Sequence, residues 1–448
     1  MQDADRLREV ASDCVHCGFC LPACPTYQLW AEEMDSPRGR IYLINQVLDG
    51  AGLTPAAAQH FDRCLGCMAC MTACPSGVQY DQLIEAARVW TEEARPAGPA
   101  AGDGNRRDRA ARAAIFALFP YPRRLRAAIW PLRAAQRTGL DRRLARSSLP
   151  ARLSPVLGAA VRLGASGAVR LGASGAGRLA PPAAAGAGRL PDRVAARGPR
   201  RAVVGMLTGC VQSVFFPQVN AATARVLAME GCDVIIPRGQ GCCGALSLHA
   251  GREAEAEGFA RATIEAFERA GVDVVVVNSA GCGSAMKEYE RLLAGVPDWA
   301  GRAEAMSGRV RDLSEFLAEL GPAAPRHPLP VTAAYHDACH LGHAQGITRQ
   351  PRELLRAIPD LRLVELPDAG TCCGSAGVYN LLQPEAASEL GARKAQAVLD
   401  AGAPLLISAN PGCSLQIAAA LADRGQSIAV AHPAEILDAS LRGLTPPT

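Results

Sequence analysis

Residues 14–25 read CVHCGFCLPACP, and residues 64–75 read CLGCMACMTACP. In each stretch, four cysteines are separated by two, two and three residues, and a proline follows the last one. Each cysteine of the first stretch recurs 50 residues later. Three thiolates at such short gaps can surround one face of a metal centre, whereas the fourth lies too far along the chain to close the same face. The pattern therefore predicts two centres that exchange their fourth ligand.

This spacing resembles that of the bacterial two-cluster ferredoxins, which implies two [4Fe–4S] clusters as cofactors. Zinc sites usually need only two well-separated pairs of cysteines, and disulfides would not explain the repeated run. We expect Pro25 and Pro75 to turn the chain away after the crossing ligand, because proline fixes φ and stops a helix. We call the two expected ligand sets site A, with Cys14, Cys17, Cys20 and Cys74, and site B, with Cys64, Cys67, Cys70 and Cys24.

The composition limits the class of protein. A length of 448 residues suits two to four domains. Of 17 cysteines, all but Cys232 fall in clustered, recurring positions, which points to metal ligation in a reducing compartment such as the cytoplasm. The charged start, MQDADRLREV, is no secretion signal, and no apolar run is long enough to span a membrane. A net charge of +4 decides nothing alone, and nothing supports binding to nucleic acid.

Residues 1–95 are predicted to form a helical domain. Apolar residues from Ile41 to Leu48 recur at helical spacing, and Gly50 would end that helix. Long helices between the cysteine runs resemble the α-helical ferredoxin fold of respiratory dehydrogenase subunits. Arg38 and Arg40 lie near the cysteines, either in a solvated loop or as charges that tune a cluster or dock a partner.

Residues 96–200 are predicted to form a basic, Pro/Gly-rich linker. It contains apolar residues interleaved with arginines and, at 160–179, an octad repeat of AVRLGASG that we expect to be a flexible tether. The basic stretch is either a helical hairpin packed on the protein or a surface that contacts an anionic membrane or a partner. Its members are Phe116, Phe119, Ile129, Trp130, Leu132, Arg123, Arg124, Arg126, Arg133, Arg142, Arg143 and Arg146.

From residue 201 onward, continuous apolar strands alternate with helices, which indicates parallel α/β layers. Residues 201–328 and 329–448 repeat one another, since their cysteines correspond at offsets of 129, 130 and 131 residues. We expect the two copies to pack about a pseudo-two-fold axis. The predicted fold class is thus α+β and multidomain: a helical two-cluster ferredoxin domain followed by a duplicated α/β domain with parallel sheets.

The cysteines of both copies follow predicted strands, at the sheet edge where ligands gather in such folds. They are Cys210, Cys242, Cys243 and Cys282 in the first copy, and Cys339, Cys372, Cys373 and Cys413 in the second. Both sets resemble the CCG domains of heterodisulfide-reductase-type proteins, which can hold an unusual iron–sulfur cluster, although the fifth cysteine of that family is missing. Further clusters, redox or structural thiols, and inert buried cysteines remain open. His336, His340 and His343 surround Cys339, and are either core or surface histidines or proton carriers near a cluster or quinone.

Several local strings carry a wider resemblance, among them CPTYQLW, SPRGRIYLINQVL, NAATARVL and CGSAGVY. They resemble the iron–sulfur subunits of bacterial glycolate oxidase (glycolate dehydrogenase), over about 1–95 and 201–448. The C subunit of anaerobic glycerol-3-phosphate dehydrogenase is a related alternative. The resemblance implies an oxidoreductase subunit without catalytic residues of its own. It would take electrons from FAD-containing subunits that oxidise glycolate to glyoxylate, and pass them to quinone or another respiratory acceptor, peripherally at the cytoplasmic face of the inner membrane. A thiol–disulfide reductase and a non-redox metal scaffold are the alternatives from other classes.

Overall fold

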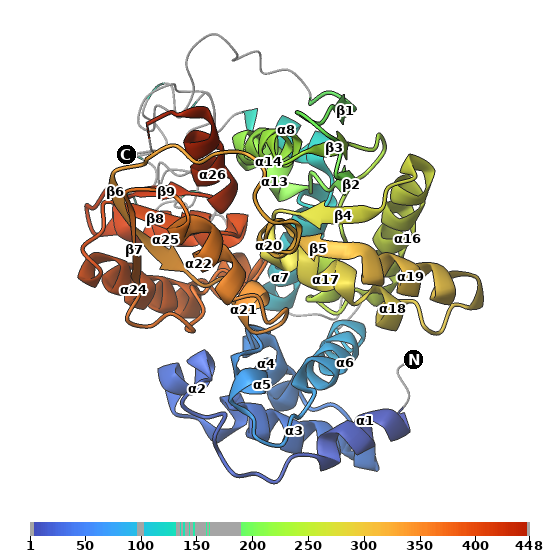
Figure 1. The fold of residues 1–448 in the computed structure, drawn as a ribbon. Coiled ribbons are helices and arrows are strands. Elements are labelled where there is room, and N and C mark those ends of the chain that lie inside the picture. Colours follow the sequence, from blue (N-terminus) through green and yellow to red (C-terminus); the bar gives the residue numbers. More distant parts are fainter. Residues whose placement is uncertain are drawn as a thin grey trace.

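The chain folds into a helical amino-terminal region and two α/β halves, which Figure 1 shows in blue below and in green to red above. This computed structural model describes residues 4–95, 103–130 and 190–445, with a few isolated positions between 131 and 161. The octad repeat lies outside the described residues, apart from Val161.

Capping residues and prolines start the helices of the amino-terminal region. Ser36 and Thr54 accept hydrogen bonds from the backbone N–H groups of Gly39 and Ala57, at 3.0 and 3.1 Å, and a proline follows each cap. The helix predicted from Ile41 onward ends in one wider turn, in which Gly50 has a φ of 94°. The elements are α1 (Ala4–Ser12), α2 (Pro25–Trp30), η1 (Glu33–Asp35), α3 (Pro37–Gln46), η2 (Val47–Ala51), α4 (Pro55–Arg63), α5 (Ala69–Ala73) and α6 (Tyr80–Glu93).

Two further helices, α7 (Asp103–Leu118) and α8 (Pro122–Ala128), connect this region to the α/β halves. Phe116 packs against Val378 and Leu381, and Leu125 packs against Val214, so α7 and α8 lie on the α/β halves. The basic stretch is therefore a packed helical segment as far as Trp130. Leu132, Arg133, Arg142 and Arg146 lie outside the described residues.

The first α/β half contains a five-stranded sheet in the order β1-β3-β2-β4-β5. All its neighbouring strands are parallel except β1, which pairs antiparallel with β3 at the sheet edge. This edge strand precedes residue 201, where we expected the domain to begin. The elements are β1 (Arg193–Val194), β2 (Ala202–Met206), α13 (Val211–Phe215), α14 (Pro217–Met229), β3 (Cys232–Ile235), α15 (Ala245–Leu248), α16 (Glu253–Ala270), β4 (Val274–Val277), α17 (Ala280–Lys287), α18 (Tyr289–Leu292), α19 (Pro297–Arg309), β5 (Val310–Asp312) and α20 (Leu313–Leu320).

The second half repeats the pattern in a four-stranded parallel sheet, in the order β7-β6-β8-β9. The strand order corresponds to β3-β2-β4-β5 of the first half, so the duplication read from the cysteine offsets extends to the topology. The elements are β6 (Val331–His336), α21 (Cys339–Gly342), α22 (Arg349–Arg356), β7 (Leu361–Glu365), α23 (Tyr379–Leu382), α24 (Pro384–Asp400), β8 (Leu405–Ser408), α25 (Pro411–Asp423), β9 (Ala429–Ala431) and α26 (Pro433–Arg442).

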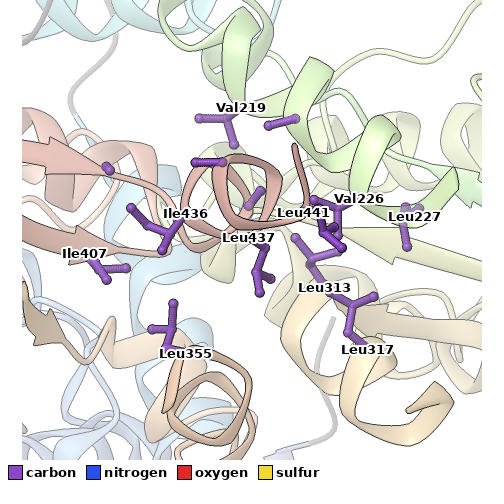
Figure 2. Close-up of a cluster of buried hydrophobic side chains, with 14 of the residues drawn as sticks. Val219, Val226, Leu227, Leu313, Leu317, Leu355, Ile407, Ile436, Leu437 and Leu441 are labelled. Carbon is purple, nitrogen blue, oxygen red and sulfur yellow. The ribbon is translucent and has the colours of Figure 1, made fainter. Parts of the chain in front are cut away.

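The two halves pack through reciprocal helix contacts. The second helix of one half meets the last helix of the other: α14 packs on α26, and α22 packs on α20. Figure 2 shows the apolar core between them, where Val226 of α14, Leu317 of α20, Leu355 of α22 and Leu437 of α26 come together. Reciprocal pairing of equivalent helices is what a pseudo-two-fold axis produces.

Candidate iron–sulfur and thiol sites

Site A surrounds a cavity of about 30 Å³ at the surface of the helical region. Cys14, Cys17 and Cys20 of the first run line this cavity together with Cys74 of the second run. Cys70 also lines the cavity. The Cys17 side chain is exposed and the other three site A cysteines are half-buried, so this site opens toward solvent.

Site B lies deeper, because all four of its cysteines are buried. Burial raises the pKa values of Cys67 and Cys70 well above the ordinary value, and the nearby sulfurs of Cys64 and Cys24 raise them further. The Cys24 thiol lies 3.2 Å from the Thr26 hydroxyl. Four buried thiolates would repel one another, so all four can ionise only if a cation offsets their negative charge. A bound metal centre supplies that positive charge.

Two buried guanidinium groups supply positive charge beside site B. Burial raises the pKa of Cys64, but Arg40 and Arg88 outweigh that effect and lower the pKa below its ordinary value. The Gly66 N–H also donates to Cys64 Sγ at 3.4 Å, and Arg88 donates to the Cys64 carbonyl at 2.6 Å. Arg40 has no exposed side-chain surface and pairs at 3.2 Å with the equally buried Asp35. Arg40 is therefore not in a solvated loop; its charge acts on a thiolate.

The backbone of both cysteine runs follows the same path. His16 and Gly18 have φ values of 53° and 86°, and Gly66 and Met68, which lie 50 residues later, have values of 63° and 60°. Left-handed conformations at two nearby positions curl the loop, so its thiolates face a common centre. The repeated strain at His16 and Met68, which are not glycines, indicates that this curled path is required, and the residues present suit two thiolate-bound clusters.

The first α/β half brings its four cysteines together at the carboxyl ends of β2, β3 and β4. The Sγ atoms of Cys210 and Cys242 are 3.7 Å apart. Cys243 is in hydrogen-bonding contact with both Cys242 and Cys282. The contact with Cys242 and burial raise the pKa of Cys243 against the opposing effect of the contact with Cys282. All four side chains are at least half-buried, so the predicted convergence of this set is seen in the structure.

The second half brings its own set together in the same way, with one addition. Cys372 is in contact with Cys339 and Cys373, and Cys373 with Cys413. A ring nitrogen of His336 and the sulfurs of Cys373 and Cys413 lie within 4.8 Å of one another. Burial, together with the neighbouring Lys394, lowers the pKa of His336 to about 3, so this imidazole is neutral near pH 7.

The cysteines of the second half also lie beside site B. Cys67 and Cys372 belong to one apolar cluster, and the charge of Cys339 acts on the Cys67 thiol. Tyr379 joins the two regions directly, because its hydroxyl donates to the Arg63 carbonyl at 3.1 Å. The first half has no such contact with site B among the described cysteines.

The histidines near Cys339 occupy different environments. His340 Nδ1 lies 3.5 Å from Cys339 Sγ, whereas His343 bonds to Thr72 and to a backbone carbonyl. The His340 ring also packs against that of His249, with centroids 5.0 Å apart, at a cavity of about 50 Å³. Sequence reasoning missed His249, because it stands alone in the sequence and only the fold brings it to His340.

Comparison with known families agrees with these sites. Residues 10–78 match the 4Fe-4S dicluster domain, and residues 204–287 and 333–418 match the Cysteine-rich domain named CCG. The expected fold class and the two [4Fe–4S] clusters are thereby confirmed. Residues 107–163 match the linker region of the glycolate oxidase iron-sulfur subunit. None of the helices in the described ranges combines the length and apolar character that a membrane crossing requires.

Similar proteins span almost the whole chain. The probable glycolate oxidase iron-sulfur subunit of Bacillus subtilis is 35% identical over 95% of this chain and 93% of its own length. The glycolate oxidase iron-sulfur subunit of Escherichia coli is 34% identical over 96% of this chain and 93% of its own length. Lactate utilization protein A of Exiguobacterium is 31% identical over 53% of this chain and 98% of its own length. This chain therefore belongs to the family of glycolate oxidase iron–sulfur subunits.

Proposed function

We propose that site A and site B each hold one [4Fe–4S] cluster. The support is the crossed arrangement of the thiolates: Cys74 of the second run lines the site A cavity, and the charge of Cys24 of the first run acts on Cys67. When bound, such clusters take up and release single electrons. The surrounding residues provide the positive charge of Arg40 and Arg88 and an apolar enclosure for site B.

On this basis the chain is the electron-transfer subunit of a complex that oxidises glycolate to glyoxylate. The two relatives of nearly full length are named as glycolate oxidase iron–sulfur subunits. Oxidation of a hydroxy acid releases two electrons, and a separate FAD-containing subunit would receive them. This chain would accept them one at a time and deliver them to quinone or another respiratory acceptor.

The observation that carries this proposal is the continuous series of sulfur positions from the surface to the interior. Cys17 is exposed in site A, Cys70 lines the site A cavity while belonging to site B, and Cys67 of site B adjoins Cys372 of the second half. Because electron tunnelling falls steeply with distance, closely spaced carriers give a direct route. The solvent-facing side of site A is where we expect a redox partner to dock.

The test uses the complete complex and the chain alone, both purified without oxygen. Glycolate should bleach the broad visible absorbance of the clusters in the complex and leave the isolated chain unchanged. Bleaching of the isolated chain by glycolate would mean that it oxidises the substrate itself. A complex that turns over glycolate to a flavin-directed dye without bleaching the clusters would exclude the electron-transfer role.

A thiol–disulfide reductase is less well supported. Its attacking thiol would need to be exposed and partly ionised. Cys242 and Cys373 are buried, and their pKa values lie well above the ordinary value. One neighbouring thiol raises and another lowers each pKa, and burial adds to the rise. Such thiols are poor nucleophiles toward an external disulfide.

A peripheral membrane contact would explain the exposed face of α8. Arg123, Arg124 and Arg126 are exposed, and 69% of the Trp130 side chain is accessible. A basic surface with an exposed aromatic ring suits an anionic bilayer. The chain should then float with anionic vesicles and stay unbound with zwitterionic ones; equal behaviour with both would exclude this contact.

A further inference from the structure

His336 is a buried imidazole whose polar atoms are unused. It ends strand β6, is 1% exposed, and neither ring nitrogen has a hydrogen-bond partner among the described residues. Leaving a polar group buried without a partner costs about 1–3 kcal/mol, so such groups usually serve a ligand, a water or a reaction. The unused nitrogens of His336 therefore point to a bound species.

The side chains around His336 indicate which kind of ligand would bind there. The ligand atoms of His336, Cys373 and Cys413 all lie within 4.8 Å of one another, and the two sulfurs are in hydrogen-bonding contact. With metal–sulfur bonds of about 2.3 Å and metal–nitrogen bonds of about 2.0 Å, the ligands of one tetrahedral ion lie roughly 3–4 Å apart. A cubane cluster places each thiolate on a different iron and holds them farther apart. The spacing suits a single ion.

The first half of the molecule provides an internal comparison. Leu207 lies three residues before Cys210, as His336 lies three residues before Cys339. The strand register agrees with this equivalence, because Met206 pairs with Val276 in the first half as Tyr335 pairs with Ile407 in the second. Leu207 is 1% exposed and belongs to the apolar core. The first half thus has a hydrocarbon side chain where the second half has an imidazole.

The surroundings suit a divalent ion bound by two thiolates. Asn410 donates a hydrogen bond from Nδ2 to Cys413 Sγ at 3.4 Å, as outer residues commonly do toward metal-bound thiolates. Lys394, a buried cation that acts on His336, pairs with Asp368 at 3.0 Å, so these two charges compensate each other. An ion of charge +2 would balance the two thiolates and leave this buried site neutral.

We propose that His336, Cys373 and Cys413 bind one thiophilic divalent metal ion, of which Zn²⁺ is the representative. Binding displaces one proton from each thiol to solvent and forms two metal–sulfur bonds and one metal–nitrogen bond. Cys372 Sγ is in contact with Cys373 Sγ but is not one of the three ligand atoms that lie within 4.8 Å of one another. The site is mononuclear and specific to the second half, and it stands whether or not the proposed partner and substrate are correct.

The experiment measures metal content on the full chain, purified without oxygen and with its iron retained, after equilibration with limiting Zn²⁺. The parent should hold about one zinc per chain, with an X-ray absorption edge that fits two sulfur ligands and at least one nitrogen. His336→Leu, which copies the first half, should lose at least tenfold in zinc affinity while keeping its iron and sulfide. His336→Cys should restore binding with three sulfur ligands.

His249→Leu is the control, because His249 is a half-buried histidine whose ring nitrogens are also buried and lack partners among the described residues. That variant should bind zinc as the parent does. Equal zinc binding by His336→Leu and the parent would overturn the proposal. So would a loss of iron and sulfide, in place of zinc, from His336→Leu, because the site would then hold a cluster.

Discussion

Two charged residues act on site B in addition to its burial. Arg40 and Arg88 both act on Cys64, and both are nearly or fully buried. Positive charge beside a cluster favours the reduced form, because reduction adds one negative charge. In these low-dielectric surroundings, the interaction energy between each charge and the cluster is larger than it would be at the surface.

Arg88→Gln should therefore lower the reduction potential of the site B cluster. The expected shift is on the order of 50–100 mV, which corresponds to about 1–2 kcal/mol per electron. Redox titration followed by electron paramagnetic resonance would measure it. Arg88→Lys keeps the charge and should shift the potential much less; equal shifts in the two variants would show that charge is not the cause.

The crossing ligand can be tested in the same way. Cys74→Ser should perturb the cluster of site A, although Cys74 belongs to the second run, because Cys74 lines the site A cavity. The magnetic signal of the solvent-facing cluster should change or disappear while that of site B persists. Cys24→Ser is the reciprocal variant, and a change confined to the cluster of each residue's own run would contradict the crossed assignment.

At the level of single elements, close packing decides where glycine is required. Gly39 lies in α3, where an added Cβ would meet the Glu33 carbonyl oxygen at 2.0 Å. Gly258 lies in α16 with nothing within 4 Å of the same position. The two helical glycines therefore serve as a matched pair.

Gly39→Ala should destabilise the helical region by about 1–3 kcal/mol or more, because η1 would have to move away from α3. Gly258→Ala should stabilise the chain by about 0.5–1 kcal/mol, because alanine is the better helix former and finds open space. Thermal or urea unfolding of the two variants, with clusters intact, would compare them. Similar effects of the same sign would contradict the packing at Gly39.

Most elements could be predicted from the sequence, since apolar periodicity and cap residues are local signals. The strands before Cys210, Cys282 and Cys413 occur close to where they were expected. Strand β1 was missed, because a two-residue edge strand has no periodicity and forms only through pairing with β3. The Arg40 environment was also undecided, because its burial depends on how α3 packs on η1 and α4.

At the level of the whole molecule, the helical region is joined to the first half through a partly buried charged cluster. Arg291 of α18 pairs with Asp81 and Glu85 of α6 at 2.5 and 2.8 Å. Glu288 shares the same arginine at 2.9 Å, so three carboxylates surround it. Burial, followed by the charges of Glu288 and Asp81, raises the pKa of Glu85 to about 8 despite the opposing charge of Arg291.

This raised pKa predicts a pH-dependent junction. The folded state holds a proton on Glu85 that the unfolded chain releases above its ordinary pKa of 4.5, so the stabilisation is complete below pH 4.5 and is lost as the pH rises toward 8. Glu85→Gln stays neutral and should gain stability relative to the parent over that window, by up to about 1.4 kcal/mol per pH unit. Urea unfolding at pH 6 and pH 8.5 tests this; a difference independent of pH would contradict it.

The arrangement of the cysteine sets relative to one another depends on the fold of the whole molecule. Which cysteines form each set could be predicted, because their spacing and the duplication are visible in one sequence. The proximity of site B to Cys372, the pairing of His249 with His340, and the contact of His336 with Cys373 could not, because each joins elements that are distant in the chain. The packing of the helical region on the second half brings site B to Cys372. The packing of the two halves brings His249 to His340, and the fold of the second half brings His336 near Cys373.

The most direct test of the account is the count of iron and acid-labile sulfide in the full chain after purification without oxygen. Two [4Fe–4S] clusters predict about eight irons and eight sulfides per chain, with a brown colour that reduction bleaches. A colourless protein with zinc in place of iron at sites A and B, or iron without sulfide, would contradict the central claim that these eight thiolates hold two clusters.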